Sequence, residues 1–125
     1  MVEEQKVWGS VKHLFDGPVS VSVLRVGAGA YCSIHKHNRR WNHFLVVSGE
    51  IDVITYGVAG EYLKPITKCT LSHLSAYVIP PGILHRFEVK KSGQVVETYW
   101  TSDGLNAEVD DIHRIEMGGR FDEKH

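Results

Sequence analysis

The amino-acid sequence predicts an all-β protein with a single domain, built as a sandwich or barrel of short strands. Apolar and polar residues alternate in several short runs, which is the period of a strand that buries one face. Glycine and proline turn signals separate these runs at close spacing, as they do in β-sandwiches and β-barrels. No convincing amphipathic helix is present.

The first part of the chain contains the clearest alternation. Residues 1–6 are charged and are expected to be loose. A turn signal at residues 16–18 precedes Val19–Val26, where valine alternates with small or polar residues, and this run is predicted as a strand. A glycine turn follows, and residues 31–37 form the next predicted strand.

The second part of the chain continues the same pattern. Further strands are predicted at residues 43–47, 51–56, 62–71, 76–80, 85–89 and 95–100. Residues 48–50, Ser-Gly-Glu, are predicted as a hairpin turn between the first two of these strands. Pro65 indicates an edge position for the run that contains it. Residues 101–111 are predicted as a loop, and the structure of residues 112–120 is left open.

Length and composition set limits on the class of protein. The 125 residues fit one domain, 1–125, with its core over about residues 7–120. The net charge of −1 suggests neither a nucleic-acid surface nor binding to an anionic membrane. Cys32 and Cys69 are expected to be free thiols in a reducing compartment. The acidic start is unlike a signal peptide, and no apolar run has the length of a membrane span, so we expect a cytoplasmic protein.

Two histidines in one predicted strand indicate a metal site. His35 and His37 are separated by one residue, so on a strand both side chains point to the same face. Two imidazoles on one face can share a metal ion, which requires nitrogen ligands at about 2.0–2.2 Å. Downstream, a tight turn at residues 80–82 is followed by a further histidine, His85.

The spacing of these residues resembles the two motifs of the cupin superfamily. The first motif reads Gly, five residues, His-x-His, three or four residues, Glu, six residues, Gly, and its glycines and histidines match Gly29, His35, His37 and Gly49. The second motif, Pro-x-Gly-x-x-His, matches residues 80–85. The resemblance implies a single-domain cupin, a double-stranded β-helix or jelly-roll barrel. It also implies that the metal ligands are His35, His37 and His85.

The glutamate of the first motif is replaced by Asn42. Three roles stay open for this residue: a metal ligand, a hydrogen-bond partner of a metal-bound water, or a structural substitute. The resulting ligand set is neutral, and imidazole suits transition metals better than magnesium or calcium. The expected cofactor is a divalent transition metal, zinc first, with iron, nickel, manganese or cobalt as alternatives.

Within the cupins, residues 7–120 resemble the type II mannose-6-phosphate isomerases, whose domain also occurs behind mannose-1-phosphate guanylyltransferases. The similar segments are residues 8–10, 23–29, 40–49, 110–114 and 119–120. The family usually has glutamine where this chain has His35. The resemblance implies a sugar or sugar-phosphate substrate and a homodimer, in keeping with the exposed edges of cupin sheets.

Candidate catalytic residues are Glu97, Tyr99 and His43. Glu97 and Tyr99 share one face of a predicted strand, and one of them is expected to project into the barrel as an acid or base. His43 is a possible further metal ligand or catalytic group, but it points outward if Asn42 points inward. A shift of register by one residue would reverse this relation.

Candidate substrate-binding residues are Arg40, Arg114 and Arg120, because guanidinium groups match phosphate and carboxylate geometry. The alternative for each arginine is ordinary surface charge. Three hypotheses of function follow from these assignments. The first is a metal-dependent sugar or sugar-phosphate isomerase or epimerase. The second is an iron- or nickel-dependent oxygenase or lyase, and the third is a non-catalytic module that binds a small carbohydrate.

Overall fold

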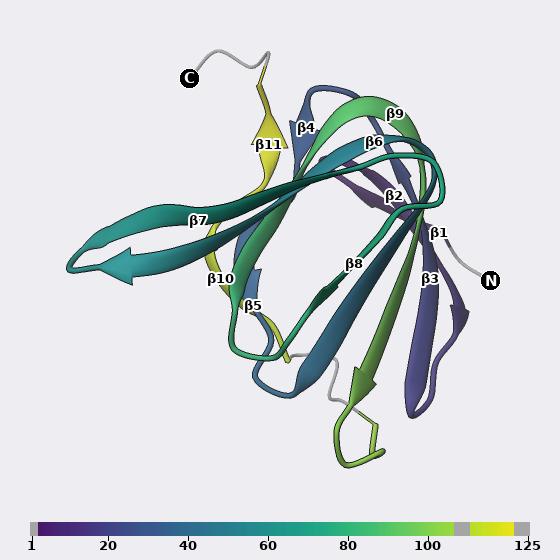
Figure 1. The fold of residues 1–125 in the computed structure, drawn as a ribbon. Helices are drawn as coiled ribbons and strands as arrows, with labels where there is room; N and C mark the ends of the chain where they lie inside the picture. The colour runs from purple at the N-terminus through teal and green to yellow at the C-terminus, as the bar shows by residue number, and fades with distance from the viewer. Residues whose placement is uncertain (1–2, 107–110, 122–125) are drawn as a thin grey trace.

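The structure is a computed structural model that describes residues 3–106 and 111–121. Within these two ranges all regular elements are strands, which confirms the all-β prediction (Figure 1). The strands are β1 (Glu3–Lys6), β2 (Gly9–Phe15), β3 (Val19–Val26), β4 (Ala30–Tyr31), β5 (Ile34–Lys36), β6 (Arg40–Ala59), β7 (Tyr62–Leu71), β8 (Ala76–Ile79), β9 (Leu84–Thr101), β10 (His113–Glu116) and β11 (Gly119–Arg120). Among the described residues, none belongs to a helix long and apolar enough to cross a membrane.

Two long strands, β6 and β9, pair antiparallel along most of their length and organise the fold (Figure 1). Both strands bend in the middle, and each contributes one half to each of two layers. One layer contains β1, β2, β3, the second half of β9, the first half of β6, and β8. The other contains β7, the second half of β6 and the first half of β9, followed by β4 and β5 with their partners β11 and β10. This two-layered antiparallel arrangement is a jelly roll.

The bend lies where two glycines face each other across the long strands. Gly49 has a φ of 84°, and a Cβ atom there would lie 2.6 Å from the carbonyl oxygen of Lys91. A Cβ atom at Gly93 would collide with the main chain of Ser48. The two backbones therefore approach more closely than side chains permit. The prediction of a hairpin turn at residues 48–50 is wrong, because β6 bends there without reversing its direction and pairs with β9 on both sides of the bend.

Other strand predictions have mixed outcomes. Val19–Val26 and residues 62–71 form β3 and β7 with the predicted bounds, and β7 is an edge strand that pairs with β6 alone among the described strands. The predicted strand at 31–37 is interrupted and forms β4 and β5. The expectation of a loose start is wrong for Glu3–Lys6, which pairs with β2. Residues 112–120, left open above, contain β10 and β11.

The space between the layers has an apolar half and a polar half. On β3 the inward face changes from Leu24 to Ser22, and on β9 it changes from Val95 to Glu97 at the paired positions. The apolar half holds the fully buried core around Leu24, Val26, Phe44, Val46, Ile51, Val53, Phe87, Val89 and Val95. Inward polar residues on adjacent strands are costly unless they are hydrogen-bonded or line a binding site. The functional site is therefore sought in the polar half.

Candidate metal centre

Three histidines meet in the polar half of the interior. His35 lies on β5 directly opposite His85 at the start of β9, and His37 follows β5. One ring nitrogen from each residue lies within 4.8 Å of the corresponding nitrogens of the other two. The exposed fractions of the three residues are 8%, 2% and 1% for His35, His37 and His85. The structure thus brings together the three histidines that the cupin motifs indicate as candidate ligands.

The three rings share one pattern of hydrogen bonding. In each ring Nδ1 donates to a main-chain carbonyl oxygen: His35 to Ser33 (2.8 Å), His37 to Asp111 (2.6 Å) and His85 to Ile83 (2.8 Å). These partners assign the proton to Nδ1, which leaves the lone pair of Nε2 free. Nε2 of His37 is buried and has no hydrogen-bond partner among the described residues. Carbonyl oxygens that orient imidazoles in this way are typical of metal-binding histidines.

Burial keeps the three imidazoles neutral. Removal from water, together with the neighbouring His85 and His37, lowers the pKa of His35 to about 2. Burial likewise lowers the pKa of His37 to about 4, against the opposing hydrogen bond to Asp111. The pKa of His85 is also lowered by burial. Neutral nitrogens with convergent lone pairs fit a divalent transition metal, and three protein ligands leave coordination positions open for a substrate.

Asn42 lies beside the cluster on the opposite layer and is completely buried. Its Nδ2 atom is 3.5 Å from Nε2 of His85, and its Oδ1 atom has no hydrogen-bond partner among the described residues. The amide is therefore within reach of the histidine nitrogens, in the place where the cupin motif has glutamate. This position is compatible with each of the polar roles considered for Asn42.

Glu97 and Tyr99 face the same interior space from the second half of β9. Burial raises the pKa of Glu97 to about 7, against the opposing effects of hydrogen bonds from Tyr99 and Asn42 and of the nearby Arg40 charge. Burial also raises the pKa of Tyr99 well above its usual value. The Tyr99 ring centroid lies 5.2 Å from that of His37. A carboxyl group with a pKa near neutrality, close to a metal site, is suited to proton transfer.

A cavity of about 730 Å³ opens beside these groups and is lined by His35, Arg40, Glu97, Tyr99 and Arg114, among others. Its size is in the range of cavities that bind small molecules, roughly 300–1,000 Å³. Aromatic rings of the core, including Trp8 and Phe87, form another part of its wall. The cavity therefore offers both apolar surface and charged groups to a ligand.

The three candidate arginines have different positions. Arg114 lies on β10 opposite His35, is exposed, and lines the cavity. Arg40 also lines the cavity, but its guanidinium is 4.4 Å above the Tyr99 ring and donates to the carbonyl oxygen of Asp111. Arg120 does not line the cavity, and its guanidinium donates to the carbonyl oxygen of Ala28. Arg114 is thus the candidate whose position best suits the binding of an anionic substrate.

His43 points away from the cluster, as strand alternation requires once Asn42 points inward. Its ring packs near Trp100, with centroids 6.5 Å apart, and it does not line the cavity. The structure therefore places His43 outside the histidine cluster and the cavity, as expected for a residue next to an inward Asn42. Asn42, the residue before it in the sequence, points inward instead.

Sequence reasoning missed Asp111 as a functional residue. It appeared only within the segment 110–114 that resembles the isomerase family, and Asp110 of that segment lies outside the described residues. The structure shows that the Asp111 carbonyl oxygen orients His37. No local signal in the sequence identifies this contact, because it joins residues 74 positions apart and uses a main-chain atom.

Compared by sequence, the chain matches no protein-family model and no curated protein. Compared by structure, it is similar to KdgF from Halomonas sp. (18% identity, TM-score 0.68), with 88% of this chain and 90% of that chain covered. It is also similar to an RmlC-like cupin from Shewanella frigidimarina NCIMB 400 (22% identity, TM-score 0.66), with coverages of 88% and 86%. A third similar structure is the capsular polysaccharide assembling protein CapF from Staphylococcus aureus (23% identity, TM-score 0.69).

These similarities establish the class of fold. The chain has the cupin fold, as the two histidine motifs predicted. The match to CapF includes 93% of this chain but only 32% of the CapF chain. Identities of 18–23% show the fold alone, so the activity must be argued from the residues of the site.

Proposed function

We propose that this protein is a metal-dependent cupin enzyme that interconverts isomers of a small sugar or sugar phosphate. One observation supports this proposal most directly. The three neutral histidines form one cluster, and one of them, His35, lines the same cavity as the carboxyl group of Glu97. An aldose–ketose isomerase needs both features, because a carbonyl oxygen must be polarised while a proton moves between adjacent carbons.

The residues that hold the metal are His35, His37 and His85. A bound divalent ion supplies Lewis-acid polarisation of the substrate carbonyl and its neighbouring hydroxyl. Zinc is the first expectation, because three imidazoles with an open position are a common catalytic zinc site. Asn42, adjacent to Nε2 of His85, is placed to contact the polarised oxygen or a water molecule at that position.

Glu97 is the proposed base. Its carboxylate oxygen takes the proton from the carbon next to the carbonyl and returns it to the former carbonyl carbon. The proton of the neighbouring hydroxyl group passes to the former carbonyl oxygen, so no net proton is consumed. A pKa near 7 makes both the receiving and the donating form accessible at neutral pH. Tyr99 is a hydrogen-bond partner of this carboxyl group and holds its orientation. Arg114, at the cavity wall beside His35, is the proposed partner of a substrate phosphate or carboxylate.

One observation favours a second candidate, an iron- or nickel-dependent oxygenase or lyase. Among the described residues, the ligand cluster consists of histidines and contains no carboxylate. A neutral three-histidine set with open positions also suits redox-active metals. In this alternative Glu97 would act on a different substrate within the same cavity.

The first test is the metal content of protein purified without chelators, compared with that of His37→Ala. Near-stoichiometric metal that is lost in the variant supports the site. The next test is aldose–ketose interconversion, measured on mannose 6-phosphate and related sugar phosphates before and after chelation. Activity that survives complete metal removal contradicts the proposal, and oxygen consumption by the iron-loaded protein would favour the second candidate. If the protein binds none of the candidate ions, the remaining hypothesis is the non-catalytic module that binds a small carbohydrate.

A further inference from the structure

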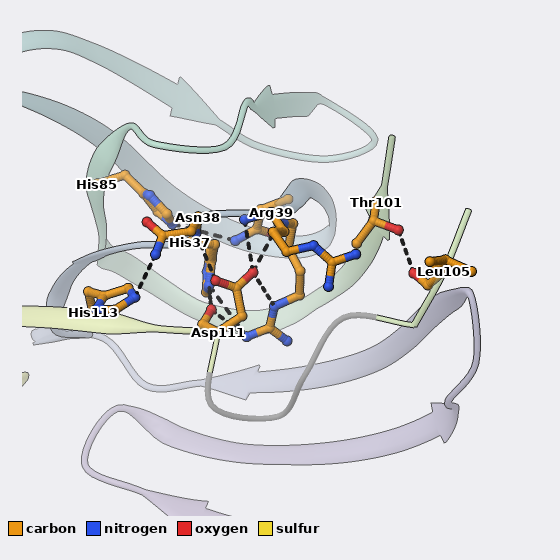
Figure 2. A network of polar contacts seen from close by, with 10 residues as sticks. His37, Asn38, Arg39, His85, Thr101, Leu105, Asp111 and His113 are labelled. Atoms are coloured by element: carbon orange, nitrogen blue, oxygen red, sulfur yellow. Dashed lines mark hydrogen bonds and ion pairs between the residues drawn. The ribbon is translucent and has the colours of Figure 1, made fainter. Parts of the chain in front are cut away.

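Asp111 connects the segment before β10 to the loop that follows β5 through hydrogen bonds. Its two carboxylate oxygens accept hydrogen bonds from three consecutive main-chain N–H groups (Figure 2): those of Asn38 (2.8 Å), Arg39 (3.1 Å) and Arg40 (3.1 Å). These hydrogen bonds lower the pKa of Asp111 despite the opposing effect of burial. A carboxylate held by three N–H groups has little freedom to move.

The main-chain carbonyl of the same residue acts on the metal centre. Its oxygen accepts a hydrogen bond from Nδ1 of His37 at 2.6 Å and another from Nη2 of Arg40 at 3.0 Å. Figure 2 shows Asp111 below His37, with its side chain turned toward the loop. The side chain therefore holds the residue in the one place from which its carbonyl reaches the histidine.

Asp111 is also connected to the proposed base, Glu97, through a series of side-chain contacts. Arg40, held by the Asp111 carbonyl, lies 4.4 Å above the ring of Tyr99. Tyr99 is in turn a hydrogen-bond partner of Glu97. Asp111 thus stands at the start of two short chains of contact, one to a metal ligand and one to the proton-transfer pair.

We propose that Asp111 is a positioning residue that sets the tautomer and orientation of His37 for metal binding. The proposal depends on the metal-binding function proposed above. When the hydrogen bonds of the Asp111 carboxylate are lost, the Asp111 carbonyl no longer has a fixed position opposite Nδ1 of His37. His37 then populates the tautomer with the proton on Nε2, in which the atom that faces the cluster cannot bind metal.

The test compares Asp111→Ala and Asp111→Asn with a matched control, Asp103→Ala. Asp103 pairs with Arg39 of the same loop at 2.8 Å, whereas the His37 ring donates to Asp111. The tautomer of His37 is measured in metal-free protein by long-range ¹H–¹⁵N NMR, and zinc affinity is measured by competition with a chelator. We expect Asp111→Ala to weaken zinc binding by about 10–100-fold and to increase the Nε2–H tautomer.

Asp111→Asn keeps the side-chain volume but loses the charge that strengthens the N–H contacts. We expect a smaller loss of affinity, at least about 3-fold. If Asp111→Ala does not fold, this variant decides the outcome. Unchanged affinity and tautomer in the Asp111 variants, or an equal loss in Asp103→Ala, would overturn the proposal. If the wild-type protein binds none of the candidate divalent ions, the proposed function fails separately, and an unchanged tautomer in the metal-free variants still refutes the positioning role.

Discussion

Glu97→Gln should make the metal-free protein more stable at alkaline pH, and it should lower the activity of the metal-loaded protein. The folded protein raises the pKa of this carboxyl group from 4.5 to about 7, chiefly through burial. A carboxyl group whose pKa is higher in the folded state binds its proton more tightly there, so folding is favoured at low pH. The wild-type protein therefore loses stability as the pH rises from about 4.5 to 7.

The magnitude follows from the shift. A difference of about 2.5 pKa units, at about 1.4 kcal/mol per unit, amounts to roughly 3–4 kcal/mol. At pH 8 this whole amount is lost from the free energy of unfolding of the wild-type protein, whereas at pH 5 only about 1 kcal/mol is lost. Glutamine has a similar shape and no charge to bury. The stability advantage of Glu97→Gln should thus grow by roughly 2–3 kcal/mol between pH 5 and pH 8.

The assay is urea unfolding of chelator-treated protein at several pH values, with Glu61→Gln as a control for the loss of a carboxylate. Glu61 lies in the turn between β6 and β7 and is exposed, away from the cavity. A stability difference that does not change with pH, or a Glu97→Gln variant less stable than wild type at pH 8, would refute the assignment of a buried carboxyl group with a raised pKa.

Four further predictions concern activity, substrate binding, the bend and assembly. Isomerase activity should rise with pH through about 7 in the wild type and fall by about 10²–10⁴-fold in Glu97→Gln; a flat pH profile would argue against Glu97 as the base. Arg114→Ala should raise the KM for a phosphorylated sugar with little change in kcat, and an equal effect on an uncharged sugar would contradict its anion-binding role. Gly49→Ala should lower the free energy of unfolding by about 1–3 kcal/mol, the cost of a strained backbone, and so lower the urea midpoint; a wild-type midpoint would show that the bend tolerates a Cβ atom. The homodimer expected from the sequence predicts a mass of twice 14.1 kDa by light scattering, and a monomer would contradict it.

The alternation of residues determined the character of the individual strands. Val19–Val26 was predicted with its observed bounds, because a strand that buries one face repeats every two residues. The same period placed His35 and His37 on one face and, with Asn42 inside, His43 outside. Two motifs spaced along the chain then predicted both the cupin fold and the meeting of His85 with the other two histidines.

The tertiary structure decided how those strands pair and how the site is tuned. Ser48 to Glu50 has the composition of a hairpin turn, yet β6 continues through it because β9 supplies the pairing partner from a distant part of the chain. The raised pKa of Glu97 depends on burial between two layers, and the tautomer of His37 depends on a carbonyl 74 residues away. Local periodicity carries no information on these features, since they arise only from the long-range pairing that buries a charge or brings a main-chain oxygen to a ring.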